Sequence, residues 1–158
     1  MATLEIRRFK KRDREAILRI TAAGFENVSM DHNLEQMFGS LGDTNWQDRK
    51  VRGVNAELDS FTEHVFVCES EGSLVGYITT DLNASTKIGH IRNLAVDPAR
   101  QGRGAGRQLI ETALQYFCDM GMETAKIETM EQNEICRKFY PTFGFKEYAR
   151  QIYYAMKL

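Results

Sequence analysis

A glycine-rich turn in the second half of the chain brings together residue types that bind anions. Gly102, Gly104 and Gly106 lie beside Arg103 and Arg107. Glycines let backbone N–H groups approach a ligand closely, because they have no Cβ and tolerate unusual backbone angles. A helix that begins directly after the turn adds unpaired N–H groups and a partial positive charge. The pattern therefore predicts a phosphate cradle, supplemented by guanidinium charge.

Two common phosphate-binding loops do not fit this spacing. A Walker loop requires a Lys-Ser or Lys-Thr pair after its last glycine, and none follows here. The dinucleotide fingerprint requires a small third residue, but counting from Gly102 and Gly104 this place is taken by Arg107. A plain surface turn with solvated arginines is the structural alternative.

The elements around the turn indicate a mixed α/β architecture. A strand is expected over Ile88–Val96, a helix follows the turn and ends at Gly121, and Ala125–Met130 reads as a further strand. A strand–turn–helix–strand unit in a hairpin-rich chain implies a mixed sheet. The other expected elements are a strand over Leu4–Phe9, a helix after Asp13, weak helices around 34–38 and 46–58, a hairpin over 65–78, a short helix opened by Asn133 and stopped by Pro141, and two strands within 145–158.

Two blocks of sequence resemble a known family. Residues 93–106 are similar to the acyl-CoA signature of the GNAT superfamily of N-acyltransferases, (Q/R)xxGx(G/A), with Gln101, Gly104 and Gly106 as its core. Residues 133–145 resemble the family's second block, an Asn and a Tyr followed by Gly-Phe. Both blocks stand in the expected order around a helix and a strand. The order of elements from Leu4 to Leu158 also fits the family, so the resemblance covers nearly the whole chain.

The resemblance implies one N-acetyltransferase domain over residues 1–158, with a mostly antiparallel central sheet of about six to seven strands flanked by helices. It implies acetyl-CoA as the acyl donor and no metal. The pantetheine arm would run beside the strand at Leu94, Ala95 and Val96. The pyrophosphate would sit on the backbone of Gln101, Gly102, Arg103, Gly104, Ala105, Gly106 and Arg107. Asn133 would lie near the lower arm of the cofactor, although an Asn that opens a helix is equally a good N-cap.

The resemblance also matches Tyr140 to the family's usual general acid. Free tyrosine, with a pKa of about 10, is a weaker acid than a thiol near about 8.5, so full protonation of a free thiolate would be uphill by about 2 kcal/mol. A hydrogen bond that tightens as charge develops on sulfur would suffice. The alternative is that Tyr140 is an aromatic core residue beside Phe139 and Phe143. Pro141 is not the usual residue after this tyrosine, so the helix could end early and the direction of the hydroxyl is not determined.

A general base must take a proton from the acceptor ammonium. His90 occupies a strand position where some members of the family carry a Glu or His base. Period-two alternation puts it on one face with Arg92 and Leu94, and a nearby Arg92 would favour the neutral imidazole that a base requires. A structural histidine, a water chain, or the carboxylates of Glu128 and Glu131 remain alternatives.

Composition limits the classes of protein that this chain can belong to. The 158 residues have a net charge of −1, 42% hydrophobic and 27% charged side chains, and three scattered cysteines. These values favour one folded domain with free thiols, a cytoplasmic location, and no nucleic-acid or membrane partner. The composition does not decide whether the chain forms a homodimer.

The segment 26–63 carries eight acidic and three basic side chains. Together with Trp46 and the 80–88 connection, it is where we expect an amine acceptor to enter, either a small molecule or a peptide. A solvated acidic helix face is the alternative. The expected function is an acyl-CoA-dependent N-acetyltransferase that works by direct transfer in a ternary complex. A non-catalytic acyl-CoA sensor or interaction module is the main rival, and a nucleotide-dependent phosphotransferase a distant third.

Overall fold

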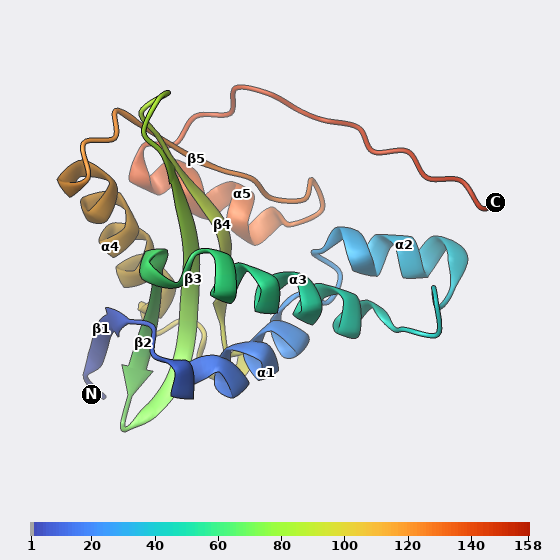
Figure 1. Cartoon of the computed structure of the whole chain (residues 1–158), viewed down its shortest axis with the longest axis horizontal. Helices are drawn as coiled ribbons and strands as arrows, with labels where there is room; N and C mark the ends of the chain where they lie inside the picture. Colours follow the sequence, from blue (N-terminus) through green and yellow to red (C-terminus); the bar gives the residue numbers. More distant parts are fainter. Residues whose placement is uncertain (1) are drawn as a thin grey trace.

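The computed structural model describes residues 2–158 and is built around one five-stranded sheet with the order β1-β2-β3-β4-β5 (Figure 1). The first four strands pair antiparallel, and β5 runs parallel to β4. The strands are β1 (Leu4–Arg8), β2 (Val65–Ser70), β3 (Ser73–Asn83), β4 (Ile88–Val96) and β5 (Thr124–Ile127).

Helices cover both faces of the sheet. On one face, α1 packs against β3 and β4, α3 packs on α1, and α2 packs on α3. On the other face, α4 lies across β1 to β4. The short helix α5 follows β5. The helices are α1 (Arg14–Gly24), α2 (Met30–Phe38), α3 (Trp46–Ser60), α4 (Ala105–Asp119) and α5 (Glu134–Phe139). Within residues 2–158, none of the helices combines the length and apolarity needed to cross a membrane.

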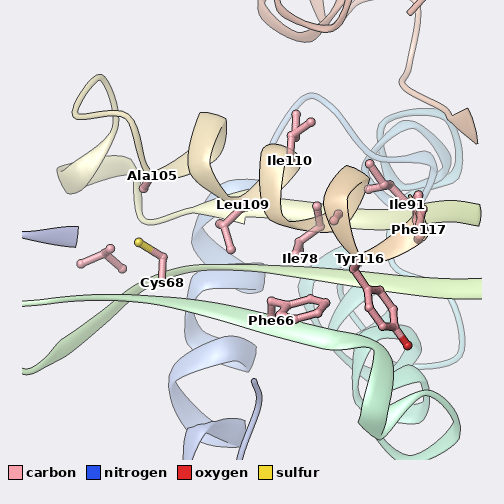
Figure 2. Packing of buried hydrophobic residues seen from close by; sticks show 11 residues of the cluster. Phe66, Cys68, Ile78, Ile91, Ala105, Leu109, Ile110, Tyr116 and Phe117 are labelled. Atoms are coloured by element: carbon pink, nitrogen blue, oxygen red, sulfur yellow. The ribbon is translucent and has the colours of Figure 1, made fainter. Parts of the chain in front are cut away.

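The larger core cluster fixes α4 on the sheet (Figure 2). Leu109, Ile110 and Phe117 project from one side of α4 onto Ile78 and Ile91 of the sheet, and all five are nearly inaccessible to solvent. Each such side chain contributes about 1.5–3 kcal/mol through burial. The helix that follows the glycine turn is therefore held rigidly above the centre of the sheet.

Most of the predicted elements are present close to the expected bounds, including the hairpin of β2 and β3. The predicted sheet of six to seven strands is wrong, because five strands are found. The two strands expected within 145–158 are missing: this segment is extended but forms no ladder with any described strand. Its alternating apolar pattern gives the tendency to form a strand, but a strand also needs a neighbour to pair with.

An irregularity in β4 changes which side chains share a face. Thr79 pairs with Asn93 and Thr80 pairs with Ile91, so Arg92 is an extra residue, a β-bulge. Beyond the bulge the alternation is reversed, and Leu94 packs into the α4 cluster. His90 therefore shares a face with Arg92, as predicted, but not with Leu94.

Candidate active site

The sheet opens into a fork between β4 and β5. Their parallel ladder joins Ile88–Ile91 to Thr124–Ile127 and stops there. β4 continues to Val96, so its backbone from residue 92 onward has β3 on one side and, within residues 2–158, no strand on the other. Exposed N–H and C=O groups of this kind can bind an extended ligand as if it were an added strand. Leu94, Ala95 and Val96, predicted to line the pantetheine arm, all lie on this open stretch.

The glycine turn connects the open stretch to the start of α4. Gly102 has φ of 77° and Gly104 has φ of 91°, both in the left-handed region that glycine adopts without strain. No side chain caps α4, and its first backbone bond runs from Gln108 N to Gly104 O at 3.1 Å. Across the described residues, the N–H groups of 102–107 donate to no protein acceptor. This cluster of free donors at a helix N-terminus fits a diphosphate.

The charged side chains of the turn differ in how firmly they are held. Arg107 lies 4.6 Å from the centroid of the Phe143 ring, donates to Thr142 Oγ1 at 3.1 Å, and approaches Glu111 at 3.7 Å. Arg103 is exposed, and the Gln101 side-chain amide donates to Val96 O at 3.3 Å. Arg107 is thereby fixed between α4 and the segment after α5, while Arg103 projects into solvent.

The short helix α5 lies against the start of α4 and ends at Phe139, directly before Tyr140. Asn133 caps the helix by accepting from Cys136 N at 3.1 Å, which confirms its predicted N-cap role. A Cβ added to Gly106 would lie 3.8 Å from the Phe139 ring, so α5 rests closely on the start of α4. Tyr140 follows Phe139, and its ring packs edge-on to Phe145 at 6.3 Å between centroids. Burial, together with the neighbouring Cys136 thiol, raises the pKa of Tyr140 well above its usual value.

His90 lies at the base of the fork, on β4. Its Nε2 is 2.5 Å from Glu128 Oε2, and its Nδ1 is 3.9 Å from Asp81 Oδ2. The imidazole is 15% exposed and the Glu128 side chain 64% exposed, so the carboxylate is the solvent-facing member of the pair. Glu128 directly follows β5, and the parallel ladder brings it opposite the region of His90.

Arg92 forms ion pairs with two carboxylates. Its guanidinium donates to Asp81 at 2.8 Å and to Glu57 at 3.1 Å, so its charge is compensated. His90 instead contacts two carboxylates. The other rival base, Glu131, forms an ion pair with Arg150 at 3.0 Å.

The polar network extends from Glu57 deeper into the protein. The Asn93 side-chain amide donates to Glu57 Oε2 at 2.5 Å, and Lys50 Nζ donates to Asn93 Oδ1 at 2.7 Å. Lys50 also lies 4.3 Å from the centroid of the Phe25 ring. Burial lowers the pKa of Lys50. Sequence reasoning missed the roles of Glu57 and Lys50, because nothing local in α3 signals contact with a strand about forty positions away.

The acidic segment 26–63 is less available to an acceptor than expected. Trp46 is only 6% exposed and packs edge-on against His32 at 5.3 Å. Glu35 accepts from Trp46 N at 2.9 Å, and Asp31 approaches Arg49 at 3.6 Å. These groups hold α2 on α3, so the aromatic ring expected at the acceptor site is part of the packing instead.

Comparison with known proteins identifies the family. The model of the acetyltransferase (GNAT) family matches residues 29–145. This chain belongs to that family.

Among its relatives, the mycothiol acetyltransferase of Streptomyces avermitilis is 30% identical, over 90% of this chain and 42% of that protein. The mycothiol acetyltransferase of Tsukamurella paurometabola is 33% identical, over 55% of this chain and 30% of its own length. The chain thus spans less than half the length of these curated relatives.

Solved structures share the fold. The PaiA N-acetyltransferase of Thermoplasma acidophilum, crystallised with coenzyme A, superposes with a TM-score of 0.70 at 16% identity, over 91% of this chain and 90% of that one. The ribosomal-protein-S18-alanine N-acetyltransferase of Escherichia coli gives 0.71 at 20% identity, over 98% and 85%. At these identities the likeness establishes a mixed α/β sheet flanked by helices.

Proposed function

We propose that this chain transfers the acetyl group of acetyl-CoA to a primary amine, directly and in a ternary complex. The observation that carries the proposal is the continuity of two features. The unpaired edge of β4 leads straight into the free N–H groups at the start of α4. One ligand with an amide-bearing arm and a diphosphate would use both features.

The proposed binding roles follow from these two features. Leu94, Ala95 and Val96 offer backbone groups to the pantetheine amides, and the turn from Gln101 to Arg107 receives the diphosphate. A β4 N–H in this stretch would also stabilise the tetrahedral oxyanion. Asn133 acts here mainly by starting α5, and so by positioning Tyr140.

The proposed chemistry needs two proton-handling groups. The amine nitrogen forms a bond to the acetyl carbon, and the thioester C–S bond breaks. The pair of His90 and Glu128 takes one proton from the acceptor ammonium before attack, directly or through water. The nitrogen releases its second proton, to water or to the departing thiolate, as the tetrahedral intermediate collapses. The Tyr140 hydroxyl donates a hydrogen bond to the leaving thiolate. The solvent-facing Glu128 carboxylate beside His90 also favours a cationic acceptor.

The experiment that tests the function is a panel of primary amines and peptides with acetyl-CoA, read out by thiol release. We expect turnover with a cationic amine. Heat from CoA binding without turnover on any amine would favour the sensor alternative. No binding of any CoA thioester at low salt would overturn the proposal.

A double-mutant cycle tests the base. The side chains of His90 and Glu128 are hydrogen-bonded and are proposed to act as one unit. We therefore expect His90→Ala, Glu128→Gln and the double variant to lose similar amounts of kcat/KM. The pH–rate profile should change in each variant. Glu131→Gln removes only the partner of Arg150 and should leave kcat/KM unchanged. Fully additive losses, or a larger loss in Glu131→Gln, would contradict the pairing.

A further inference from the structure

Two consecutive side chains of β4 lie on the same side of the sheet. Arg92 is the extra residue of the bulge, and Asn93 follows it. In a regular strand these two side chains would point to opposite faces. Here both reach the face that carries α1 and α3, since both donate to the Glu57 side chain of α3. Ile91 and Leu94, on either side of them, both pack into the α4 cluster on the other face.

The Glu57 carboxylate offers one oxygen to each of the two bulge residues. Arg92 Nε donates to Oε1 at 3.1 Å, and Asn93 Nδ2 donates to Oε2 at 2.5 Å. Thr79, the β3 residue that pairs with Asn93, donates its hydroxyl to Oε2 at 2.9 Å. One carboxylate of α3 therefore joins both residues of the bulge to the neighbouring strand.

These contacts are largely shielded from water. Thr79 is fully buried, Asn93 is 7% exposed, and the Glu57 side chain is 18% exposed. Hydrogen bonds to an ionised acceptor are stronger than bonds between neutral groups. A carboxylate that is mostly out of water also needs its donors, because a buried charge without partners is costly. The bond between α3 and the bulge is therefore one that the fold gives up only with a large loss.

Lys50 fixes the other end of the Asn93 side chain. Lys50 Nζ donates to Asn93 Oδ1 at 2.7 Å, so the amide nitrogen must face Glu57 and Thr79. Burial lowers the pKa of Lys50, and the negative charge of Glu57 partly offsets this effect. Positions 50 and 57 are about two turns apart and share one face of α3. The same face of the helix thus holds the Asn93 amide from both ends.

The bulge decides which backbone groups of β4 face the fork. Beyond it, Ala95 packs into the cluster beneath α1 and α3, while Leu94 and Val96 pack towards α4. A shift of one residue reverses the alternation of a strand, so the groups that faced one neighbour face the other. Since β3 occupies one side of this stretch, the bulge selects the N–H and C=O groups that remain for an added ligand.

We infer that Glu57 is a positioning residue for the donor: it holds the bulge in place, and so presents the backbone of residues 94–96 in the register that the pantetheine arm uses. Its bonds are to Arg92, Asn93 and Thr79, so it acts through them. The effect on donor binding rests on the proposed function, whereas the hold on the bulge does not.

Glu57→Gln tests the inference in the full chain. The variant keeps the side-chain volume but replaces one acceptor oxygen with an NH₂ group, which cannot accept from Arg92 or Asn93. We expect amide exchange at residues 92–96 to be about tenfold faster, and coenzyme A to bind about tenfold more weakly by calorimetry, the effect of losing a hydrogen bond to a charged group. Unchanged exchange, or unchanged affinity for coenzyme A, would overturn the inference.

Glu35→Gln is the matched control. Glu35 is a half-buried carboxylate that joins α2 to α3 by accepting from Trp46 N at 2.9 Å, and within residues 2–158 it has no hydrogen bond to β4. We expect this variant to be less stable, with unchanged exchange at residues 92–96 and unchanged affinity for coenzyme A. An equal loss of affinity in Glu35→Gln would mean that any destabilisation around α3 weakens donor binding, which contradicts a positioning role for Glu57.

Thr79→Val provides a second variant if Glu57→Gln does not fold. It removes the hydroxyl between Glu57 and Asn93. We expect exchange at residues 92–96 to accelerate by a smaller factor, and unchanged exchange would count against the hold on the bulge. Failure of the proposed function looks different, because the unaltered chain would then bind no CoA thioester. Equal binding of coenzyme A by the unaltered chain and Glu57→Gln would leave the donor site in place and remove only the role of Glu57.

Discussion

At the scale of single residues, the environment of Tyr140 suggests how the hydroxyl would act. A tyrosine whose pKa is raised by burial keeps its proton at every physiological pH. It is thus always able to donate a hydrogen bond, and it is a poorer source of a fully transferred proton. Stabilisation of the thiolate by a strengthening hydrogen bond is the role that this environment favours.

Removing that hydroxyl should affect catalysis and not the fold. In Tyr140→Phe, we expect kcat to fall by about 100-fold or more, the usual contribution of a positioned acid. The ring contacts with Phe139 and Phe145 would remain. Thiol release under saturating acetyl-CoA measures the effect, and full kcat would remove Tyr140 from the mechanism.

Tyr116→Phe is the matched control. It deletes a hydroxyl that lies 2.5 Å from His64 Nδ1, near the far end of α4. We expect a loss of about 1 kcal/mol in the free energy of unfolding and unchanged kcat.

Residue-level prediction from the sequence succeeded where the signal is local. Asn133 as a cap and the glycines of the turn follow from helix and backbone chemistry that neighbouring residues determine. The contacts of His90 did not follow, because Asp81 and Glu128 reach it from two other strands and their flanks. Tertiary contacts of this kind leave no trace in local spacing.

At the scale of elements, the start of α4 depends on a backbone angle. Gly104 has φ of 91°, where any other residue is strained by about 1–2 kcal/mol. In Gly104→Ala, relief of that strain would turn the free N–H groups away from the ligand. We therefore expect a higher KM for acetyl-CoA and a lower unfolding temperature.

Gly53→Ala is the control for that substitution. Gly53 is inside α3 with ordinary helical angles, and a Cβ there meets nothing within 4 Å. We expect this variant to be more stable by about 0.5–1 kcal/mol with an unchanged KM. Equal KM values in the two variants would show that the turn does not bind the donor.

The join between β1 and α1 depends on an ion pair that predicts a pH effect. Asp13, 5% exposed, directly precedes α1, and its carboxylate accepts from Arg7 at 2.8 Å and from Lys10 N at 2.7 Å. Burial raises the pKa of Asp13, but the bonds from Arg7 and Lys10 outweigh it, and the net pKa is below 3.8. Its contribution to stability is therefore present above about pH 4 and is lost as the pH falls through the lowered pKa.

Asp13→Asn should show this dependence. We expect it to lose about 3 kcal/mol at pH 7, because it leaves Arg7 partly unpaired, and to approach the wild type at acidic pH. Asp59→Asn, which breaks an exposed pair with Arg14, should cost at most about 1 kcal/mol. Urea unfolding between pH 3 and 7 provides the comparison, and a pH-independent difference would contradict the assignment.

Element-level prediction failed at two places for different reasons. No glycine or proline at Arg92 signals the bulge in the sequence. The bulge is defined only by the register between β4 and β3. Residues 145–158 were expected as two strands because the segment is rich in residues that favour strands. Whether such a segment pairs depends on which edge is within reach, and that is a property of the assembled chain.

At the scale of the whole molecule, binding of the donor should appear as stability. At a hundred times its Kd, acetyl-CoA would add about 2.7 kcal/mol, which corresponds to an increase of about 5–10 °C in Tm for a chain of this size. ATP at the same concentration and ionic strength is the control, because it offers phosphates without the pantetheine arm. An equal shift with ATP would favour the phosphotransferase alternative.

The divergence of β4 and β5 has a consequence for the protein without its donor. The sheet separates between its fourth and fifth strands, so the main chain of β4 after residue 91 has a strand partner on one side only within residues 2–158. The donor would then act as a missing strand, and its departure after each turnover would loosen the interior more than the periphery. Amide exchange at residues 92–96 should therefore slow when acetyl-CoA binds, so the same few amides would report both occupancy and the integrity of the fold.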